Sequence, residues 1–167
     1  MPAFPDWVLV LIFWLHFLAT VTLIGGIVIV SILVLPAART LKPVDQLTLT
    51  SAIEKRLEPV TWFSLSLLVV TGLFQMSVNI HYNGFLSVST QWSIAILTKH
   101  LLVILLIVVC AIQSWDTLPS IRRLLLRKDK ASQEEAEKLQ RREVWLQRAS
   151  LILAILILGA TAFMRAA

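Results

Sequence analysis

Cysteine is almost absent from this chain of 167 residues, in which Cys110 is the only one. A single cysteine excludes an intramolecular disulfide, a cysteine-based zinc site and an iron–sulfur cluster. Charged residues are also scarce, at 15% of the sequence, against about 25% in a soluble domain. Hydrophobic residues make up 57% and the mean hydropathy is +0.82, which is too apolar for the polar exterior of a small globule. We therefore expect an integral membrane protein.

Four stretches of the sequence are apolar and long enough to cross a bilayer. Residues 7–35 and 59–80 contain no charge, residues 92–115 are interrupted by Lys99 and His100, and residues 145–164 contain Arg148 near their start. At about 1.5 Å per residue, each stretch can span a hydrocarbon core about 30 Å thick as a helix. The first stretch is too long for a signal peptide and has no basic residues before it, so we expect it to be retained. The sequence predicts an all-α fold, a transmembrane four-helix bundle that forms one domain over residues 1–167, with cytoplasmic loops at 36–58 and 116–144.

Lysine and arginine are distributed unevenly between the connections. The 81–91 connection contains none, whereas the segments 37–58 and 116–148 contain nearly all of them. Cytoplasmic loops retain positive charge, so we predict that both termini lie outside (periplasmic or extracellular). The net charge of +5 then reflects topology, and we expect the lipid bilayer and no nucleic acid as a partner. The predicted location is the cell (inner or cytoplasmic) membrane.

Two further patterns agree with this topology. Five of the six tryptophans fall near the predicted ends of the spans, as they do in the aromatic belts of membrane proteins; Trp14 is the exception. Trp7 and Trp92 lie at outer ends, and Trp62, Trp115 and Trp145 at inner ends. Ser132 followed by Glu135 has the pattern of a capping box. We therefore expect the fourth helix to begin near residue 132, below the membrane.

Three ionisable residues lie deep in the predicted spans, namely His16, Lys99 and His100. Such residues cost at least about 2.5–3.5 kcal/mol each on insertion scales, so each is a candidate for function. His16 lies about 13 Å and His100 about 12 Å below the outer surface, at about 1.5 Å per residue. The two histidines are thus predicted at one depth, on the first and third helices. This arrangement suits two axial ligands of a haem iron or one bound metal ion.

Neighbouring residues leave room for a cofactor at this depth. Thr20 projects on the same side of its helix as His16, and Thr71 of the second span reaches a similar level. No Asp or Glu lies in any predicted span to pair with Lys99. A haem propionate that points outward would supply the anion for Lys99, and Arg165 would supply a second cation. From these residues we predict a haem b site, with electron transfer as its function and a redox partner or a larger membrane complex as its setting.

A second set of candidate ligands lies near the outer face. Imidazole and thioether groups are the ligands that a copper entry site would use. The candidates for such a path are His16, Met76, His81 and Met164. Copper uptake or transport is therefore the alternative to haem b.

The order of motifs resembles the CopD-type copper-resistance membrane family over nearly the whole chain. The segments that carry the resemblance are LHFLATVTLIGG followed by LPAAR, WFSLSLLVVTGLFQ, WSIAILTKHLLVILLIVVCAIQSWDTLPSI and REVWLQRASLILAIL. The resemblance implies a four-helix membrane domain linked to copper uptake or handling, with His16 at the family's helix-one histidine position. His100, directly after Lys99, is not part of that pattern, and it favours a b-type cytochrome on a CopD-like scaffold.

The chain is also distantly similar to the HemJ-type protoporphyrinogen oxidases, four-helix proteins with a helix-one histidine and a helix-three lysine. The arginine expected after the first span of that group is replaced by Leu35 and Pro36. In this second alternative, Lys99 would steer the carboxylates of a tetrapyrrole. The spans contain no paired acid and base, so we expect an electron carrier or a transporter rather than an enzyme.

Overall fold

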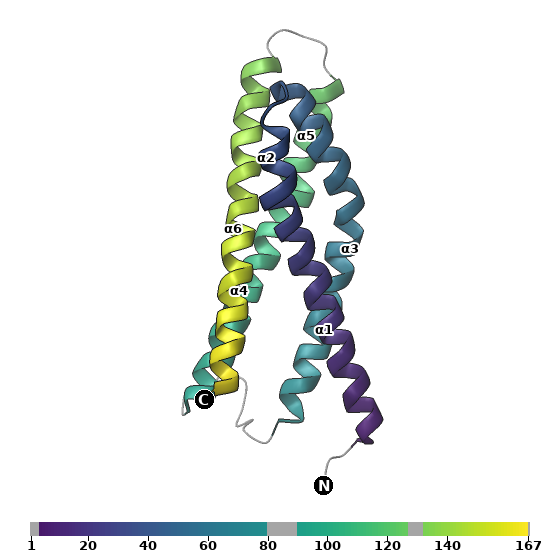
Figure 1. Ribbon diagram of the computed structural model, residues 1–167, viewed down its shortest axis with the longest axis vertical. Coiled ribbons are helices and arrows are strands. Elements are labelled where there is room, and N and C mark those ends of the chain that lie inside the picture. The colour runs from purple at the N-terminus through teal and green to yellow at the C-terminus, as the bar shows by residue number, and fades with distance from the viewer. Residues whose placement is uncertain (1–3, 80–89, 127–131, 167) are drawn as a thin grey trace.

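The computed structural model describes residues 4–79, 90–126 and 132–166, and within these ranges it is helical without a β-strand. Its helices form four long columns (Figure 1). The columns are α1 (Asp6–Val28) with the π-helical segment η1 (Ile29–Val34) and α2 (Leu35–Ala38); α3 (Pro43–Ser77); α4 (Gln91–Ile112) with the π-helical segment η2 (Gln113–Thr117) and α5 (Leu118–Leu126); and α6 (Ser132–Ala166). Each column is long and apolar enough to cross a membrane. The predicted all-α bundle of four spans is therefore confirmed.

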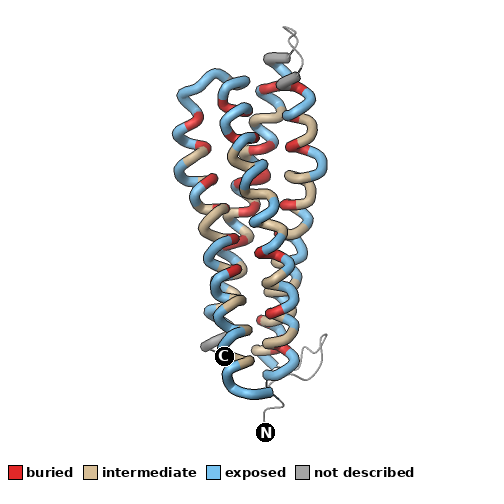
Figure 2. The backbone as a smooth tube through the Cα atoms, turned by 90° about the vertical axis from the view of Figure 1, so that its right-hand side faces the viewer, coloured by how far each residue is buried: buried red, intermediate tan, exposed pale blue. Residues whose placement is uncertain are grey.

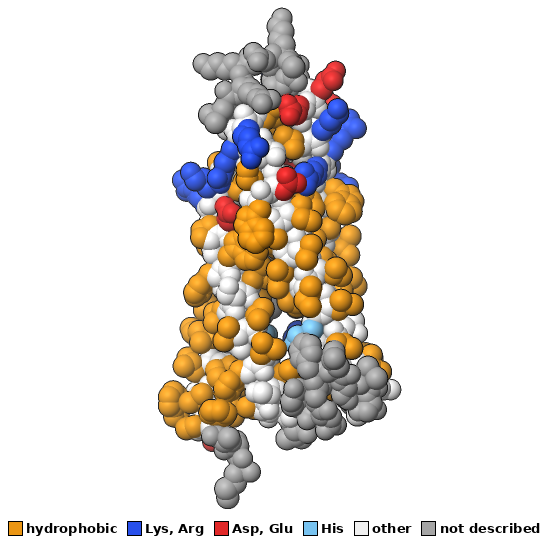
Figure 3. All heavy atoms as spheres, turned by 180° about the vertical axis from the view of Figure 1, so that it is seen from behind, with side chains coloured by type: hydrophobic (Ala, Val, Ile, Leu, Met, Phe, Trp, Pro, Cys, Tyr) orange, Lys and Arg blue, Asp and Glu red, His pale blue; other side chains and the backbone are white. Residues whose placement is uncertain are grey.

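The two ends of the bundle differ in charge. Both termini lie at one end, here called the terminal end, and the turn between α2 and α3 lies at the other (Figure 1). Charged side chains gather at that second end, here called the basic end, while apolar side chains cover most of the remaining length (Figure 3). Helices occupy most of the two segments predicted as loops, since α3 already begins at Pro43 and α6 at Ser132. The start of α6 is the one expected from the capping pattern.

The bundle consists of two hairpins, in which α1 packs along α3 and α4 along α6. A central core joins all four columns through Leu23, Ile27, Leu65, Leu106, Cys110 and Ala154. Cys110 is thus an apolar packing residue. A second core, made of Leu47, Ile121, Leu124 and Ala136, lies at the basic end. Buried residues are more frequent toward the basic end than toward the terminal end (Figure 2), so the terminal half has the looser interior.

The two hairpins repeat the same order of elements. In each, an apolar helix passes through a π-helical segment into a short helix that begins with Leu-Pro, and a helix of 35 residues then returns. The π-helical hydrogen bonds run from the N–H of Leu35 to the carbonyl of Val30 and from Leu118 to Gln113. The following residues, Pro36 and Pro119, have no N–H to donate and crowd the carbonyl four residues earlier. The change in hydrogen-bond register precedes each proline, as expected where the α-helical ladder is interrupted.

Candidate functional site

The imidazole of His16 is held by the second column. Its Nδ1 lies 2.7 Å from the hydroxyl of Thr71 on α3, and Thr71 is buried. That hydroxyl also lies 2.5 Å from the carbonyl of Leu67. The carbonyl can only accept, so the proton of Thr71 points to Leu67 and the Thr71 oxygen accepts from Nδ1–H of His16. In the neutral imidazole, Nε2 is then the nitrogen with a free lone pair.

A glycine makes room for this ring. A Cβ atom at Gly72 would lie 3.4 Å from Cε1 of His16, at the close limit of van der Waals contact. Ala19, the next buried residue of α1, is also small. The imidazole therefore packs against α3 at Thr71 and Gly72, where α3 has no large side chain.

The two remaining deep residues, Lys99 and His100, lie on α4. The charge of Lys99 acts on His16 across the bundle, so these two predicted site residues share one region. His100 donates from Nδ1 to its own helix, to the carbonyl of Ile96 at 2.7 Å. The two histidines occupy matching positions, because each lies the same number of residues before the π-helical segment of its column. Histidine side chains are visible in the terminal half, in a hollow among apolar side chains (Figure 3).

The other predicted site residues are placed less closely around His16. Thr20 donates to the backbone carbonyl of His16 at 2.8 Å, so its hydroxyl serves its own helix. Met76 is buried on α3 and Met164 is half-buried on α6. His81 and the side chain of Arg165 lie outside the described residues. Among the residues that the structure describes, no group of three or more His, Cys, Asp or Glu side chains could hold a metal ion.

Sequence reasoning missed two neighbouring acids in the basic half, the buried Glu143 and the half-buried Glu54. Glu143 of α6 is 2% exposed and accepts a hydrogen bond from the hydroxyl of Thr50 on α3 at 3.3 Å. The charge of Glu143 also acts on Glu54, one turn along α3 from Thr50. Both acids lie just outside the apolar stretches at 59–80 and 145–164. In the sequence, an acid at such a position is typical of a solvated helix end. The signal that could have revealed them is their equal distance from the start of two helices of equal length.

A chain of hydrogen bonds between glutamine side chains lies beside the central core. Gln113 of η2 donates to Gln147 of α6 at 3.1 Å, and Gln147 donates to the carbonyl of Ile27 on α1 at 3.3 Å. Gln147 also lines a cavity of about 80 Å³ that reaches Glu54 and Cys110. The interior of the bundle therefore contains polar side chains next to the central apolar core.

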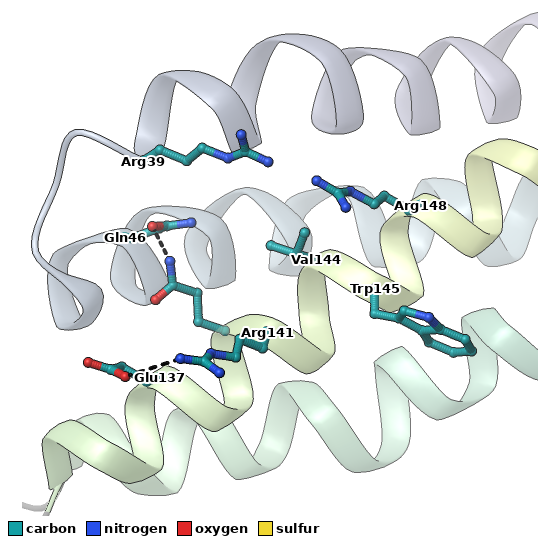
Figure 4. Close-up of a pocket in the computed structure, with 8 residues that line it drawn as sticks. Arg39, Gln46, Glu137, Arg141, Val144, Trp145 and Arg148 are labelled. Carbon is teal, nitrogen blue, oxygen red and sulfur yellow. Dashed lines mark hydrogen bonds and ion pairs between the residues drawn. The ribbon is translucent and has the colours of Figure 1, made fainter.

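A larger pocket, of about 480 Å³, opens at the surface of the basic end between α2, α3 and α6 (Figure 4). Arg39 and Arg148 extend toward each other across it, and Gln46 faces Gln140 through a hydrogen bond. The pocket is lined by Arg39, Gln46, Glu137, Gln140, Arg141, Val144, Trp145 and Arg148. Glu137 pairs with Arg141 at 3.7 Å. The pocket is thus positively charged, and Trp145 lies at its edge with 67% of its surface exposed.

Comparison with known proteins adds one finding to this geometry. The family model for copper resistance protein D (CopD) matches residues 51–164. The chain belongs to the CopD family. No curated protein and no solved structure matches it.

Membership of the CopD family confirms the first resemblance and favours the copper alternative. It makes this a multi-pass membrane protein of a family linked to copper resistance or uptake. The copper alternative therefore has support that the haem b interpretation lacks. The match begins within α3, so the roles of His16 and the rest of α1 depend on the geometry described above.

Proposed function

We propose that this CopD-family protein passes copper ions through the terminal half of its bundle, with Nε2 of His16 as a ligand. The observation that carries the proposal is the contact between His16 and Thr71. Metal-binding histidines commonly donate their second ring N–H to a fixed acceptor, which sets the tautomer and aims the free nitrogen. Thr71 gives His16 that arrangement, because its own proton is already engaged by Leu67.

The other ligands of the proposed path suit copper in its reduced form. Imidazole and thioether are ligands that copper(I) accepts, whereas hard cations prefer oxygen. Met76 is buried on α3, about 8 Å along the helix from Thr71 at about 1.5 Å per residue. Copper that enters at the terminal end would meet Met76 before His16, and His81 and Met164 are the remaining candidates for the entrance.

The charge of Lys99 suits transit better than storage. Its positive charge acts on His16 and therefore opposes a cation bound there. Conduction requires a site that binds strongly enough to admit the ion and weakly enough to release it. A single imidazole opposed by a lysine is a site of this kind.

A copper(I) competition titration on the purified full-length protein tests the proposal. His16→Ala should remove the tightest bound copper(I), and His100→Ala is the matched control, because His100 lies at the equivalent position of the other hairpin and is no part of the proposed path. We expect the His100→Ala variant to bind copper like the wild type. Equal copper binding by His16→Ala and the wild type would contradict the proposal.

An absorption spectrum of the same samples tests the haem b alternative. A Soret band that disappears in both the His16→Ala and the His100→Ala variants would replace copper with a haem held by the two histidines. A colourless protein that binds copper through His16 would support the copper path.

A further inference from the structure

The pocket of about 480 Å³ at the basic end brings two arginines face to face. Arg39 is the residue that ends α2, Arg148 lies on α6, and their guanidinium groups extend toward each other across the pocket (Figure 4). Two cations that face each other repel. An anion held between them would replace this repulsion with attraction to both.

The acids of the chain do not supply this anion. Among the residues that the structure describes, neither Arg39 nor Arg148 forms an ion pair. Glu137 is the only acid among the described residues that line the pocket, and it is engaged by Arg141 at 3.7 Å. Three arginines thus line the pocket against one acid. The pocket therefore has an excess of positive charge that a ligand could neutralise.

The hydrogen-bonding groups of the pocket suit a phosphate diester. A guanidinium group presents paired N–H donors that match two oxygens of a phosphate, and the pocket offers Arg39 and Arg148 on opposite sides. Gln46 is 2% exposed, and its Oε1 accepts a hydrogen bond from Gln140. The Nε2 group of Gln46 is then left as a neutral donor in the wall of the pocket.

The level of the pocket is that of the polar interface of a bilayer. Trp145 lines the pocket and is 67% exposed, and tryptophan is enriched where lipid headgroups meet hydrocarbon. Arg148 lies almost one turn further into the apolar stretch at 145–164. Ile152, which shares a helical face with Arg148, is 58% exposed. A phosphate held at Arg148 would therefore have an apolar helix surface beside it, as the acyl chains of a lipid require.

We propose that this pocket binds the phosphodiester headgroup of an anionic phospholipid between Arg39 and Arg148, with the acyl chains along α6 over Ile152. Basic pockets between transmembrane helices are sites of this kind in other membrane proteins. The two arginines belong to different hairpins, so the bound headgroup would also tie the hairpins together. The site goes beyond the proposed copper path and does not depend on it, because His16 lies in the terminal half of the bundle.

Native mass spectrometry of the full-length protein in detergent, titrated with phosphatidylglycerol or phosphatidylcholine of equal chain length, tests this site. The wild type should bind phosphatidylglycerol more tightly, because the ammonium group of choline is repelled by the arginines of the pocket. Arg39→Gln and Arg148→Gln should each lower the affinity for phosphatidylglycerol about tenfold, the effect of one hydrogen bond to a charged group. Arg123→Gln is the matched control, since Arg123 lies on α5 outside the pocket, and it should bind like the wild type.

Equal affinity of the wild type for the two lipids would overturn the proposal, whether or not the variants fold. A loss in Arg123→Gln as large as in the two pocket variants would also overturn it, because binding would then depend on net charge alone. Displacement of phosphatidylglycerol by an equal concentration of inorganic phosphate would assign the pocket to free phosphate instead of lipid. His16→Ala should bind phosphatidylglycerol like the wild type, so this test and the copper titration can fail separately.

Discussion

The substitution Thr71→Val tests the proposed role of Thr71 directly. Valine has nearly the same shape as threonine and keeps the contact with α1, but it removes the only hydrogen-bond acceptor found for Nδ1 of His16 among the described residues. The backbone carbonyl of Leu67 is satisfied within its own helix after the change. The substitution therefore changes only the hydrogen bond that Nδ1–H of His16 donates.

The size of the effect follows from the loss of one buried acceptor. A buried N–H without a partner costs about 1–3 kcal/mol, and the imidazole avoids this cost when its proton moves to Nε2. Copper can then bind only after the proton returns to Nδ1, so affinity falls by the same free energy. At about 1.4 kcal/mol for each factor of ten, the loss should be about 5-fold to 150-fold, which agrees with the 10–100-fold typical when the hydrogen-bond partner of a metal ligand is removed.

The assay is a competition titration with a coloured copper(I) chelator on the full-length protein in detergent. Thr98→Val is the matched control, because the Thr98 hydroxyl is exposed and donates at 2.8 Å to the carbonyl of Ile94 in its own helix. We expect wild-type affinity in Thr98→Val and wild-type helix content in both variants. Unchanged copper affinity in Thr71→Val would refute the argument that Thr71 sets the tautomer of His16.

Three further substitutions test the packing around the site and the core. Gly72→Val should lower copper affinity by displacing the ring of His16, whose Cε1 lies 3.4 Å from a Cβ at that position; the same titration measures it, and tighter binding would contradict the expectation. Leu106→Ala should destabilise the bundle by about 2–5 kcal/mol, because Leu106 is 2% exposed in the central core; reversible unfolding in mixed micelles measures the loss. Trp62→Phe should lower the free energy of unfolding by about 0.5–1.5 kcal/mol, because it removes the 3.2 Å hydrogen bond to Ser114. If the bond is the cause, the loss in the double variant with Ser114→Ala should be smaller than the sum of the two single losses.

The general architecture could be predicted from sequence because a bilayer imposes simple rules on length and charge. The four spans follow from runs without charge, and the basic end follows from the segments that hold lysine and arginine. Even the placement of tryptophan was informative, since Trp62 and Trp115, both predicted at inner ends, stack with ring centroids 5.6 Å apart. The level of Thr71 was predicted from helical rise alone, and the structure places its hydroxyl 2.7 Å from Nδ1 of His16.

The parts that could not be predicted depend on which helix faces meet. Glu54 and Glu143 are separated by most of the chain and lie beyond the apolar runs, so neither length nor hydropathy brings them together. Thr20 shares a helical face with His16 but donates to a backbone carbonyl, a bond that a hydroxyl in a helix forms wherever the neighbouring helix offers nothing better. The match in depth between His16 and His100 led to the haem b prediction, whereas the family match supports copper.

The π-helical segments have a consequence for how sequences of this family should be compared. On the first column, the buried residues Ala19, Leu23, Ile27 and Val30 follow one another at helical spacing, and the next buried residue, Leu35, comes five residues after Val30. A π-helical turn holds one residue more than an α-helical turn, so the longer step keeps Leu35 on the inward face. In evolutionary terms, η1 is the place where one inserted residue can be absorbed without rotating the remainder of the helix. Relatives that lack the proline after η1 should therefore be one residue shorter at this point, and a sequence alignment should place its gap there rather than in the connection that follows.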